Sequence, residues 1–137
     1  MRQQTSFIFD LDGTLTDSVY QNVFAWKTAL DSEDIPLAMW RIHRKIGMSG
    51  GLMLKMLARE TGLEIKPDQA KRLSDKHDEA YKDLQGQISA LPGAVELLDR
   101  LNRDQLKWCI ATSGGMDTAV INLKALGLDI SKVNLIT

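Results

Sequence analysis

The sequence predicts an α/β fold in which a partial parallel sheet is interrupted by a helical insertion. Three short apolar segments, at residues 5–10, 107–113 and 133–137, have the pattern of buried strands. From residue 92 onward helical and strand patterns alternate, which is typical of a parallel sheet with right-handed crossovers. Residues 18–89, in contrast, show no strong strand pattern.

The first predicted strand, residues 5–10, is a run of large apolar side chains that ends in an acid. A short apolar run of this kind predicts a strand that is buried on both faces and has an exposed C-terminal end. Residues 107–113 repeat the pattern, and residues 133–137 repeat it more weakly. Cys109 lies within the second of these strands, where we expect a packed thiol rather than a nucleophile.

Two predicted helices separate the later strands. Residues 93–103 follow Pro92-Gly93, a common helix entry, and carry apolar side chains at helical spacing. Residues 116–126 show the same spacing, and Gly127 follows them as a predicted C-terminal cap.

The insertion contains four helical patterns, at residues 18–31, 37–46, 50–61 and 67–85. Five large apolar side chains at helical spacings are expected to form its core: Trp26, Trp40, Met53, Met56 and Leu57. We therefore predict two domains, with residues 1–17 and 90–137 in the α/β core and residues 18–89 in the helical domain. The α/β part is short for an open sheet, so its helices should cover the sheet poorly.

The composition is that of a soluble globular protein, with 44% hydrophobic and 26% charged residues among 137. A formal net charge of −1 argues against nucleic acid or an anionic membrane as a partner. The single cysteine permits no internal disulfide, and we expect no signal peptide and no membrane-spanning segment. These features favour a cytoplasmic location and do not determine the oligomeric state.

Two carboxylates stand where the first predicted strand ends. Asp10 and Asp12 are two residues apart, so on an extended chain their side chains point the same way. Gly13 allows a sharp turn away from the sheet. Ligands of open α/β sheets bind outside the carboxyl ends of the strands, and paired oxygens there suit a hard cation such as Mg²⁺. They also suit a division of work between a carboxylate nucleophile and a general acid/base.

The segment from Phe9 to Leu15 resembles the first motif of the haloacid dehalogenase (HAD) superfamily of phosphohydrolases. The resemblance implies an α/β fold with a partial, parallel, Rossmann-like HAD core and an inserted α-helical cap domain. It implies that Asp10 is the nucleophile that becomes an aspartyl-phosphate and that Asp12 is the general acid/base. Mg²⁺ would bind the Asp10 carboxylate and the Asp12 backbone carbonyl.

A second segment after residues 107–111 is similar to the second motif of this superfamily. The resemblance implies that Thr112, Ser113 and Gly114 hold the phosphoryl oxygens. The chemistry agrees, because a hydroxyl, flexible glycines and a helix N-terminus together form an anion site.

Two further motifs of the superfamily, a lysine and a later acidic pair, have no counterpart in these residues. We therefore expect the chain to correspond to the N-terminal part of such an enzyme, with little or no turnover on its own. Without the lysine the phosphoryl charge loses a counter-charge, and without the acidic pair Mg²⁺ should bind weakly. The first strand should present an unpaired edge.

The expected activity is hydrolysis of a small phosphorylated metabolite. The region after Asp17 resembles phosphoglycolate-phosphatase-like enzymes and also β-phosphoglucomutases. The mutases usually carry a histidine where Asn22 stands, which favours the phosphatase. A phosphosugar mutase and a non-catalytic truncated binding module remain alternatives.

A basic, glycine-containing segment of the cap is the predicted specificity element. Its candidate residues are Arg44, Lys45, Gly47, Ser49 and Gly50. The alternative, that the basic side chains are only a solvated helix face, stays open at this point. His43 and His77 are expected at the surface, and residues 66–83 are expected to form a solvated, mixed-charge helix.

Overall fold

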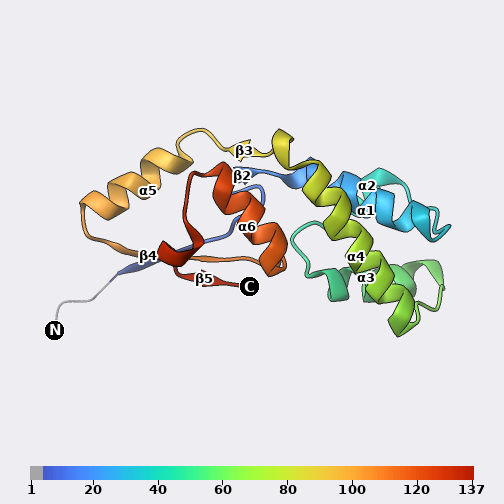
Figure 1. Ribbon diagram of the computed structural model, residues 1–137. Coiled ribbons are helices and arrows are strands. Elements are labelled where there is room, and N and C mark those ends of the chain that lie inside the picture. Colours follow the sequence, from blue (N-terminus) through green and yellow to red (C-terminus); the bar gives the residue numbers. More distant parts are fainter. Residues whose placement is uncertain (1–4) are drawn as a thin grey trace.

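The computed structural model describes residues 5–137, which form an elongated molecule with helices α1–α4 toward one end and the main sheet toward the other (Figure 1). In chain order they are β1 (Ser6–Phe9), β2 (Thr16–Asp17), α1 (Val19–Ser32), α2 (Met39–His43), α3 (Gly50–Thr61), α4 (Pro67–Asp83), η1 (Gln85–Gln87), β3 (Ser89–Ala90), α5 (Ala94–Arg103), β4 (Lys107–Ala111), α6 (Met116–Ala125), η2 (Ile130–Lys132) and β5 (Leu135–Ile136). We call α1–α4 the helical unit, and β1, β4 and β5 with α5 and α6 the sheet unit. Each predicted strand and helix is present, with ends displaced by a few residues.

The predicted α/β architecture is confirmed. The main sheet has the order β1-β4-β5, and both pairings are parallel. Within residues 5–137, β1 pairs with β4 alone, so it is the edge strand that the sequence predicts. The carboxyl ends of β1 and β4 therefore lie side by side, and the loops that follow them meet.

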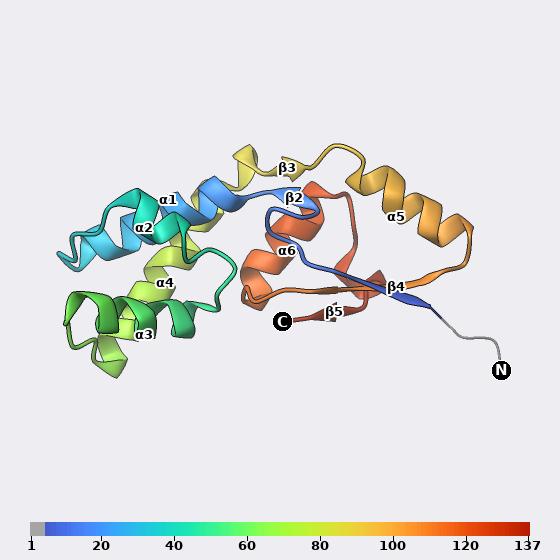
Figure 2. The same ribbon diagram turned by 180° about the vertical axis from the view of Figure 1, so that it is seen from behind.

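The expectation that the first strand is buried on both faces is wrong. Ile8 of β1 is 69% exposed, whereas Ile110 of β4 is fully buried. Along the chain, the strands follow one another across the sheet in one direction, from β1 to β4 to β5. Right-handed connections between them therefore place α5 and α6 on the same face of the sheet. Figures 1 and 2 show both helices on one side of the strands. Ile8 faces the other side, which these helices leave open.

The helical unit has its own hydrophobic core, formed mainly by α1, α3 and α4. Trp26, Met53 and Leu57 are buried there as predicted. Trp40 is not, because it is 58% exposed. The short helix α2 buries Ile42 instead, and a residue two positions earlier on a helix faces a different side.

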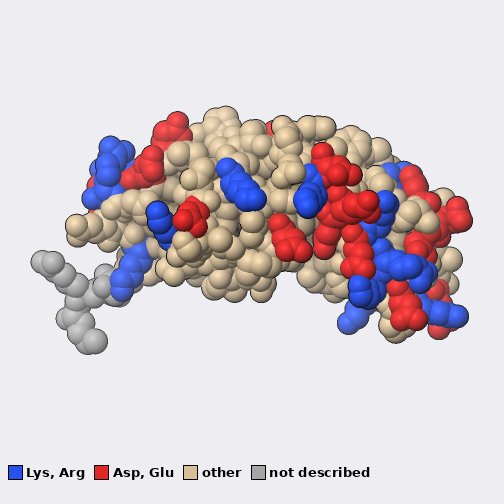
Figure 3. Space-filling view, in the orientation of Figure 1, with Lys and Arg blue, Asp and Glu red and all other residues tan. Residues whose placement is uncertain are grey.

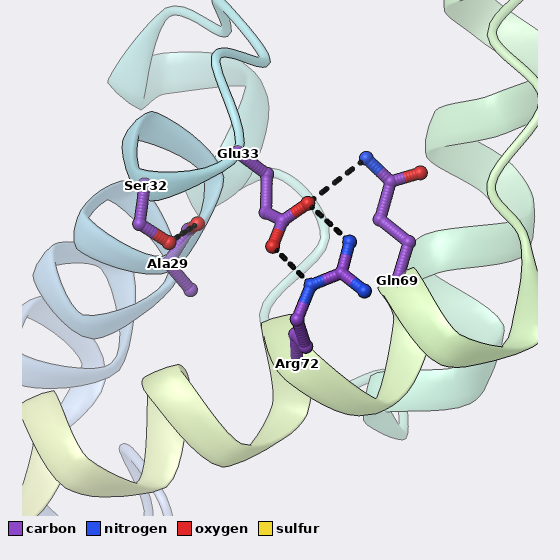
Figure 4. A network of polar contacts seen from close by, with 5 residues as sticks. All are labelled: Ala29, Ser32, Glu33, Gln69 and Arg72. Carbon is purple, nitrogen blue, oxygen red and sulfur yellow. Dashed lines mark hydrogen bonds and ion pairs between the residues drawn. The ribbon is translucent and has the colours of Figure 1, made fainter.

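A polar network ties the end of α1 to α4 (Figure 4). Arg72 donates two hydrogen bonds to the Glu33 carboxylate, of 2.6 Å from Nε and 2.8 Å from Nη2, and Gln69 donates a third of 3.3 Å. The hydrogen bond from Arg72 is the main reason that the pKa of Glu33 lies below its ordinary value. This bidentate geometry fixes the loop after α1 against α4.

Two chain segments connect the units. β2 and β3 form a short antiparallel ribbon, in which Thr16 pairs with Ala90 and Asp17 with Ser89. Beside it a small buried cluster brings together Ala25, Tyr81 and Ile88, with Ile121 and Ala125 of α6 packed against them. Residues of α1, α4 and α6 thus meet at the junction of the two units.

The outer face of α4 carries intermingled acidic and basic side chains, as predicted (Figure 3). Lys71 pairs with Asp75 and Lys76 with Glu79, both at helical spacing. No helix of the described residues is long and apolar enough to cross a membrane.

The prediction of a surface position for His77 is wrong, because only 6% of that residue is exposed. His77 lies on the buried face of α4 with Leu73 and Tyr81, each four residues from the next.

Candidate active site

The loop after β1 is built around one backbone carbonyl. The carbonyl oxygen of Leu11 accepts hydrogen bonds from the backbone N–H groups of Thr14, Leu15 and Thr16, at 3.2, 3.0 and 3.1 Å. It also accepts one of 3.1 Å from the Thr16 hydroxyl. Leu11 and Leu15 are buried in the core of the sheet unit. The loop that carries the two aspartates is therefore anchored at both ends.

Gly13 is required by this turn for two reasons. Its φ is +74°, in the left-handed region that side chains disfavour. A Cβ at this position would also lie 2.7 Å from Cγ2 of Val19, the first residue of α1. The glycine lets the start of α1 pack directly against the turn.

Asp10 and Asp12 have different surroundings. Asp10 is exposed, and its Oδ2 accepts a hydrogen bond of 3.2 Å from the Thr14 hydroxyl. Asp12 is half-buried, and its Oδ1 accepts hydrogen bonds of 2.7 Å from the Ser18 hydroxyl and 2.9 Å from Nδ2 of Asn122. One carboxylate is thus free to meet a substrate, and the other is held on one side by the protein.

The hydroxyl of Tyr81 completes the surroundings of Asp12. It lies 3.4 Å from Oδ1 of Asp12 and donates a hydrogen bond of 2.8 Å to Oδ1 of Asn122. Burial raises the pKa of this hydroxyl, and the charge of Asp12 raises it further, so it stays protonated. Sequence reasoning missed Ser18, Tyr81 and Asn122 as parts of the site. The signal for Asn122 is a polar side chain on the apolar face of a helix.

The loop after β4 reaches the same place. The backbone N–H of Gly114 donates a hydrogen bond of 3.0 Å to the Thr112 hydroxyl. A Cβ on Gly114 would lie 3.0 Å from Oγ1 of Thr118 and 3.8 Å from Oδ2 of Asp12. Gly114 is therefore adjacent to the second carboxylate oxygen of Asp12, just before the N-terminus of α6. Backbone N–H groups at a helix N-terminus favour an anion.

A cavity of about 380 Å³ opens between the two units at these loops. The sequence-predicted residues among those that line it are Asp10, Asp12, Lys45, Gly47, Gly50, Ser113 and Gly114. Thr112, Arg44 and Ser49 do not line it. The structure thus brings most of the predicted residues from both units to one cavity, while their roles stay predictions.

The two basic candidates of the cap segment differ. Lys45 is buried beside the cavity and forms an ion pair of 2.7 Å with Glu60. The hydrogen bond that Lys45 donates to Glu60 is the main reason that the pKa of Glu60 lies below its ordinary value. Arg44 is exposed, and its guanidinium lies 5.8 Å from the ring centre of Trp40. Lys45 therefore remains a candidate for contact with a ligand in the cavity, and Arg44 has the position of a surface residue.

His77 forms part of the cavity wall, which the sequence did not predict. Its Nε2 lies 2.9 Å from Oδ1 of Asn22, and its Nδ1 lies 2.9 Å from Oδ1 of Asp78. Its ring stacks on Trp26, with 4.3 Å between the ring centres. This wall of the cavity therefore combines polar side chains with an aromatic ring.

The loop after β1 offers oxygen atoms of the type that binds a magnesium ion. Mg²⁺ prefers oxygen ligands, keeps several waters and is often held by one or two carboxylates together with substrate phosphate. The Asp10 carboxylate and the Asp12 backbone carbonyl are donors of this type at one loop. In residues 5–137 no group of three or more His, Cys, Asp or Glu side chains is placed to hold a metal.

Comparisons with known proteins agree with this arrangement. A family model described as haloacid dehalogenase-like hydrolase matches residues 7–135. Hexitol phosphatase A of Escherichia coli (strain K12) is 35% identical over 132 residues, which cover 93% of this chain and 56% of that protein. Beta-phosphoglucomutase of Bacillus subtilis (strain 168) is 31% identical over 111 residues, covering 77% of this chain and 49% of that protein.

A solved structure gives the same picture of the fold. The crystal structure of a hydrolase from Pseudomonas syringae is 76% identical to this chain and superposes with a TM-score of 0.96. The match covers 98% of this chain and 61% of that one. The chain thus spans about half the length of the two curated relatives that it matches.

Proposed function

Since the chain belongs to the haloacid dehalogenase-like hydrolase family, as its first motif predicted, we propose a role for its two aspartates. They are the nucleophile and the general acid/base of a Mg²⁺-dependent phosphatase. The substrate is a small phosphorylated metabolite. One observation carries the proposal: Asp10 and Asp12 line one cavity with Gly114, on loops that follow neighbouring parallel strands.

In the first step, a carboxylate oxygen of Asp10 attacks the phosphorus of the ester and the bond from phosphorus to the ester oxygen breaks. Asp12 gives its proton to that oxygen, so the product leaves as an alcohol. In the second step, Asp12 takes a proton from water, and the water oxygen attacks the aspartyl-phosphate. Inorganic phosphate leaves and Asp10 is regenerated.

The chain's other residues bind and orient the phosphoryl group. Thr112, Ser113 and Gly114 precede α6, with Gly114 beside Asp12, and in this proposal they hold the phosphoryl oxygens. Mg²⁺, held by the Asp10 carboxylate and the Asp12 carbonyl, would neutralise negative charge on the phosphoryl oxygens.

We further propose that residues 18–89 act as a cap over a core made of residues 1–17 and 90–137. The cavity between the units supports this division, because a substrate there is shielded from water by both. Lys45, Gly47 and Gly50 then select the substrate from the cap side, with Arg44 and Ser49 as outer members of the same segment. The single cysteine, Cys109, suits a reducing compartment, so we place the protein in the cytoplasm.

A phosphosugar mutase is the second candidate, because one relative is a beta-phosphoglucomutase. Asn22, where such mutases usually carry a histidine, lies against the imidazole of His77. The two candidates differ in product: a phosphatase releases inorganic phosphate, whereas a mutase returns the phosphoryl group to a sugar hydroxyl.

The experiment begins with the intact mass of the natural protein and continues on that species. Phosphate release is measured with Mg²⁺ from sugar phosphates, polyol phosphates and phosphoglycolate. We expect release to be lost in Asp10→Asn and kept in Asp17→Asn, an exposed aspartate of β2 outside the cavity. Release that survives Asp10→Asn would refute the proposed nucleophile.

A further inference from the structure

The two carboxylate oxygens of Asp12 face different groups. Oδ1 accepts hydrogen bonds from Ser18, just before α1, and from Asn122 on α6, and the hydroxyl of Tyr81 on α4 lies 3.4 Å from it. Oδ2 instead lies on the side of Gly114, where a Cβ added to the glycine would be 3.8 Å away. That side is where the second motif is predicted to bind the phosphoryl group, so Oδ2 is the oxygen beside the proposed reaction.

The orientation of the Asn122 amide is set by Tyr81. The Tyr81 hydroxyl donates to Oδ1 of Asn122 at 2.8 Å, which leaves Nδ2 to face Asp12 at 2.9 Å. An amide nitrogen donates hydrogen bonds and accepts none. Both Asn122 and Tyr81 have no exposed surface, so water cannot take the place of either partner.

This arrangement excludes a proton from one oxygen of Asp12. A proton on Oδ1 would point at the N–H of Asn122 and would break the buried chain of hydrogen bonds. A proton on Oδ2 meets no such donor and lies on the side of Gly114, which lines the cavity. We propose that Asn122 and Tyr81 are positioning residues that restrict proton transfer by Asp12 to Oδ2.

The inference rests on the proposed function and adds an atomic detail to it. As the bond from phosphorus to the ester oxygen breaks, its electron pair stays on that oxygen, and the proton of Asp12 Oδ2 forms the new O–H bond. In the second step the same oxygen takes one proton back from the attacking water. Without Asn122 or Tyr81 the carboxyl group can rotate, and its proton no longer points at the leaving oxygen.

The test compares two substrates in the full-length natural protein. An alkyl phosphate, such as a hexitol phosphate, needs a proton on its leaving oxygen, whereas p-nitrophenyl phosphate has a leaving group that departs without one. The quantity measured is kcat/KM, which reports the step in which the leaving group departs. Tyr81→Phe keeps the ring and its contact with His77, and Asn122→Leu removes the amide with little change in volume.

We expect kcat/KM for the alkyl phosphate to fall by about 10- to 100-fold in each variant, a part of what general acid catalysis contributes. For p-nitrophenyl phosphate we expect less than about a threefold loss, because that reaction does not use the proton. Tyr20→Phe, which removes an exposed hydroxyl outside the cavity, serves as the control and should change neither value. An equal loss for both substrates would mean ordinary structural damage and would overturn the inference.

A second measurement separates this inference from the proposed function. In the wild type, the side-chain amide protons of Asn122 should exchange slowly with solvent, and exchange should become faster in Tyr81→Phe and in Asp12→Ala. Fast exchange in the wild type contradicts the arrangement even if the protein is an active phosphatase. A wild type that hydrolyses neither ester refutes the function, and the proton assignment with it, whatever the exchange rates.

Discussion

The hydroxyl of Ser113 donates a hydrogen bond of 2.9 Å to the backbone carbonyl of Gly47, 66 residues away in sequence. Ser113 belongs to the loop after β4, and Gly47 belongs to the segment between α2 and α3. Both line the cavity. The bond joins the predicted phosphate loop to the predicted specificity segment and thereby links the two units at the cavity itself.

Removal of this bond should loosen the specificity segment. In Ser113→Ala we expect faster amide hydrogen exchange at residues 46–49 and a fall of about 1 kcal/mol in the free energy of unfolding. Ser89→Ala, at an exposed serine of β3 outside the cavity, should change neither quantity. Unchanged exchange at residues 46–49 in Ser113→Ala would show that this bond does not hold the segment.

Gly50 and Gly51 offer a matched pair for testing the contact with Trp26. A Cβ on Gly50 would lie 3.2 Å from Cζ2 of Trp26, whereas a Cβ on Gly51 meets nothing within 4 Å. Trp26 is buried and stacked on His77, so it has little room to yield. We expect Gly50→Ala to be less stable than Gly51→Ala by about 1 kcal/mol in urea unfolding. Equal stabilities would contradict a tight contact here.

Replacement of Gly13 should be more damaging. Gly13→Ala combines a positive φ with a contact of 2.7 Å to Val19, and we expect a loss of about 1–3 kcal/mol in the free energy of unfolding. Val19→Ala in the same chain should recover the part that is due to the contact. Gly86→Ala, at an open position without positive φ, should be close to neutral. A neutral Gly13→Ala would speak against the turn described above.

The ion pair of Glu33 and Arg72 should contribute stability that depends on pH. The pKa of Glu33 in the folded protein is lowered from its ordinary value of 4.5, mainly by the hydrogen bond from Arg72. The contribution is therefore fully present above that ordinary value and is lost as the pH falls through the lower, folded-state pKa.

Unfolding by urea at several pH values tests this expectation. Arg72→Leu should be less stable than the wild type at pH 7, and the difference should shrink as the pH falls below about 4. Lys71→Leu removes the neighbouring exposed ion pair with Asp75 and should have a smaller effect. A difference between Arg72→Leu and the wild type that stays constant from pH 7 to pH 3 would rule out the ion pair as its source.

The sequence predicted the parts of the site that depend on local geometry. Asp10 and Asp12 lie two residues apart after an apolar strand, and both line the cavity, while their catalytic roles stay predictions. Asn122 and Tyr81 could not be assigned in this way, because Asp12 lies 110 and 69 residues from them. A single polar residue on an apolar helix face shows that it has a buried partner but does not identify the partner.

The periodicity of apolar residues predicted where the helices and strands lie. It did not predict the burial of side chains whose exposure depends on which element packs against them. Ile8 is a large apolar residue typical of a core, yet neither α5 nor α6 covers the face of the sheet on which it lies. The predicted burial of Trp40 was wrong for a similar reason, because a helix of five residues buries only one narrow side. The predicted surface position of His77 was wrong in the opposite sense, because the residue is buried. The many charged residues of α4 drew attention away from its buried face, whose residues recur every four positions.

The groups around Asp12 also differ in when they are made. Ser18 follows Asp12 by six residues and leaves the ribosome almost with it. Asn122 follows by 110 residues, which at ordinary rates of synthesis is a delay of roughly 5–20 s. During that interval the growing polypeptide displays both aspartates without the amide that orients one of them. A nascent chain halted before Asn122 would therefore carry the complete first motif but an unoriented acid.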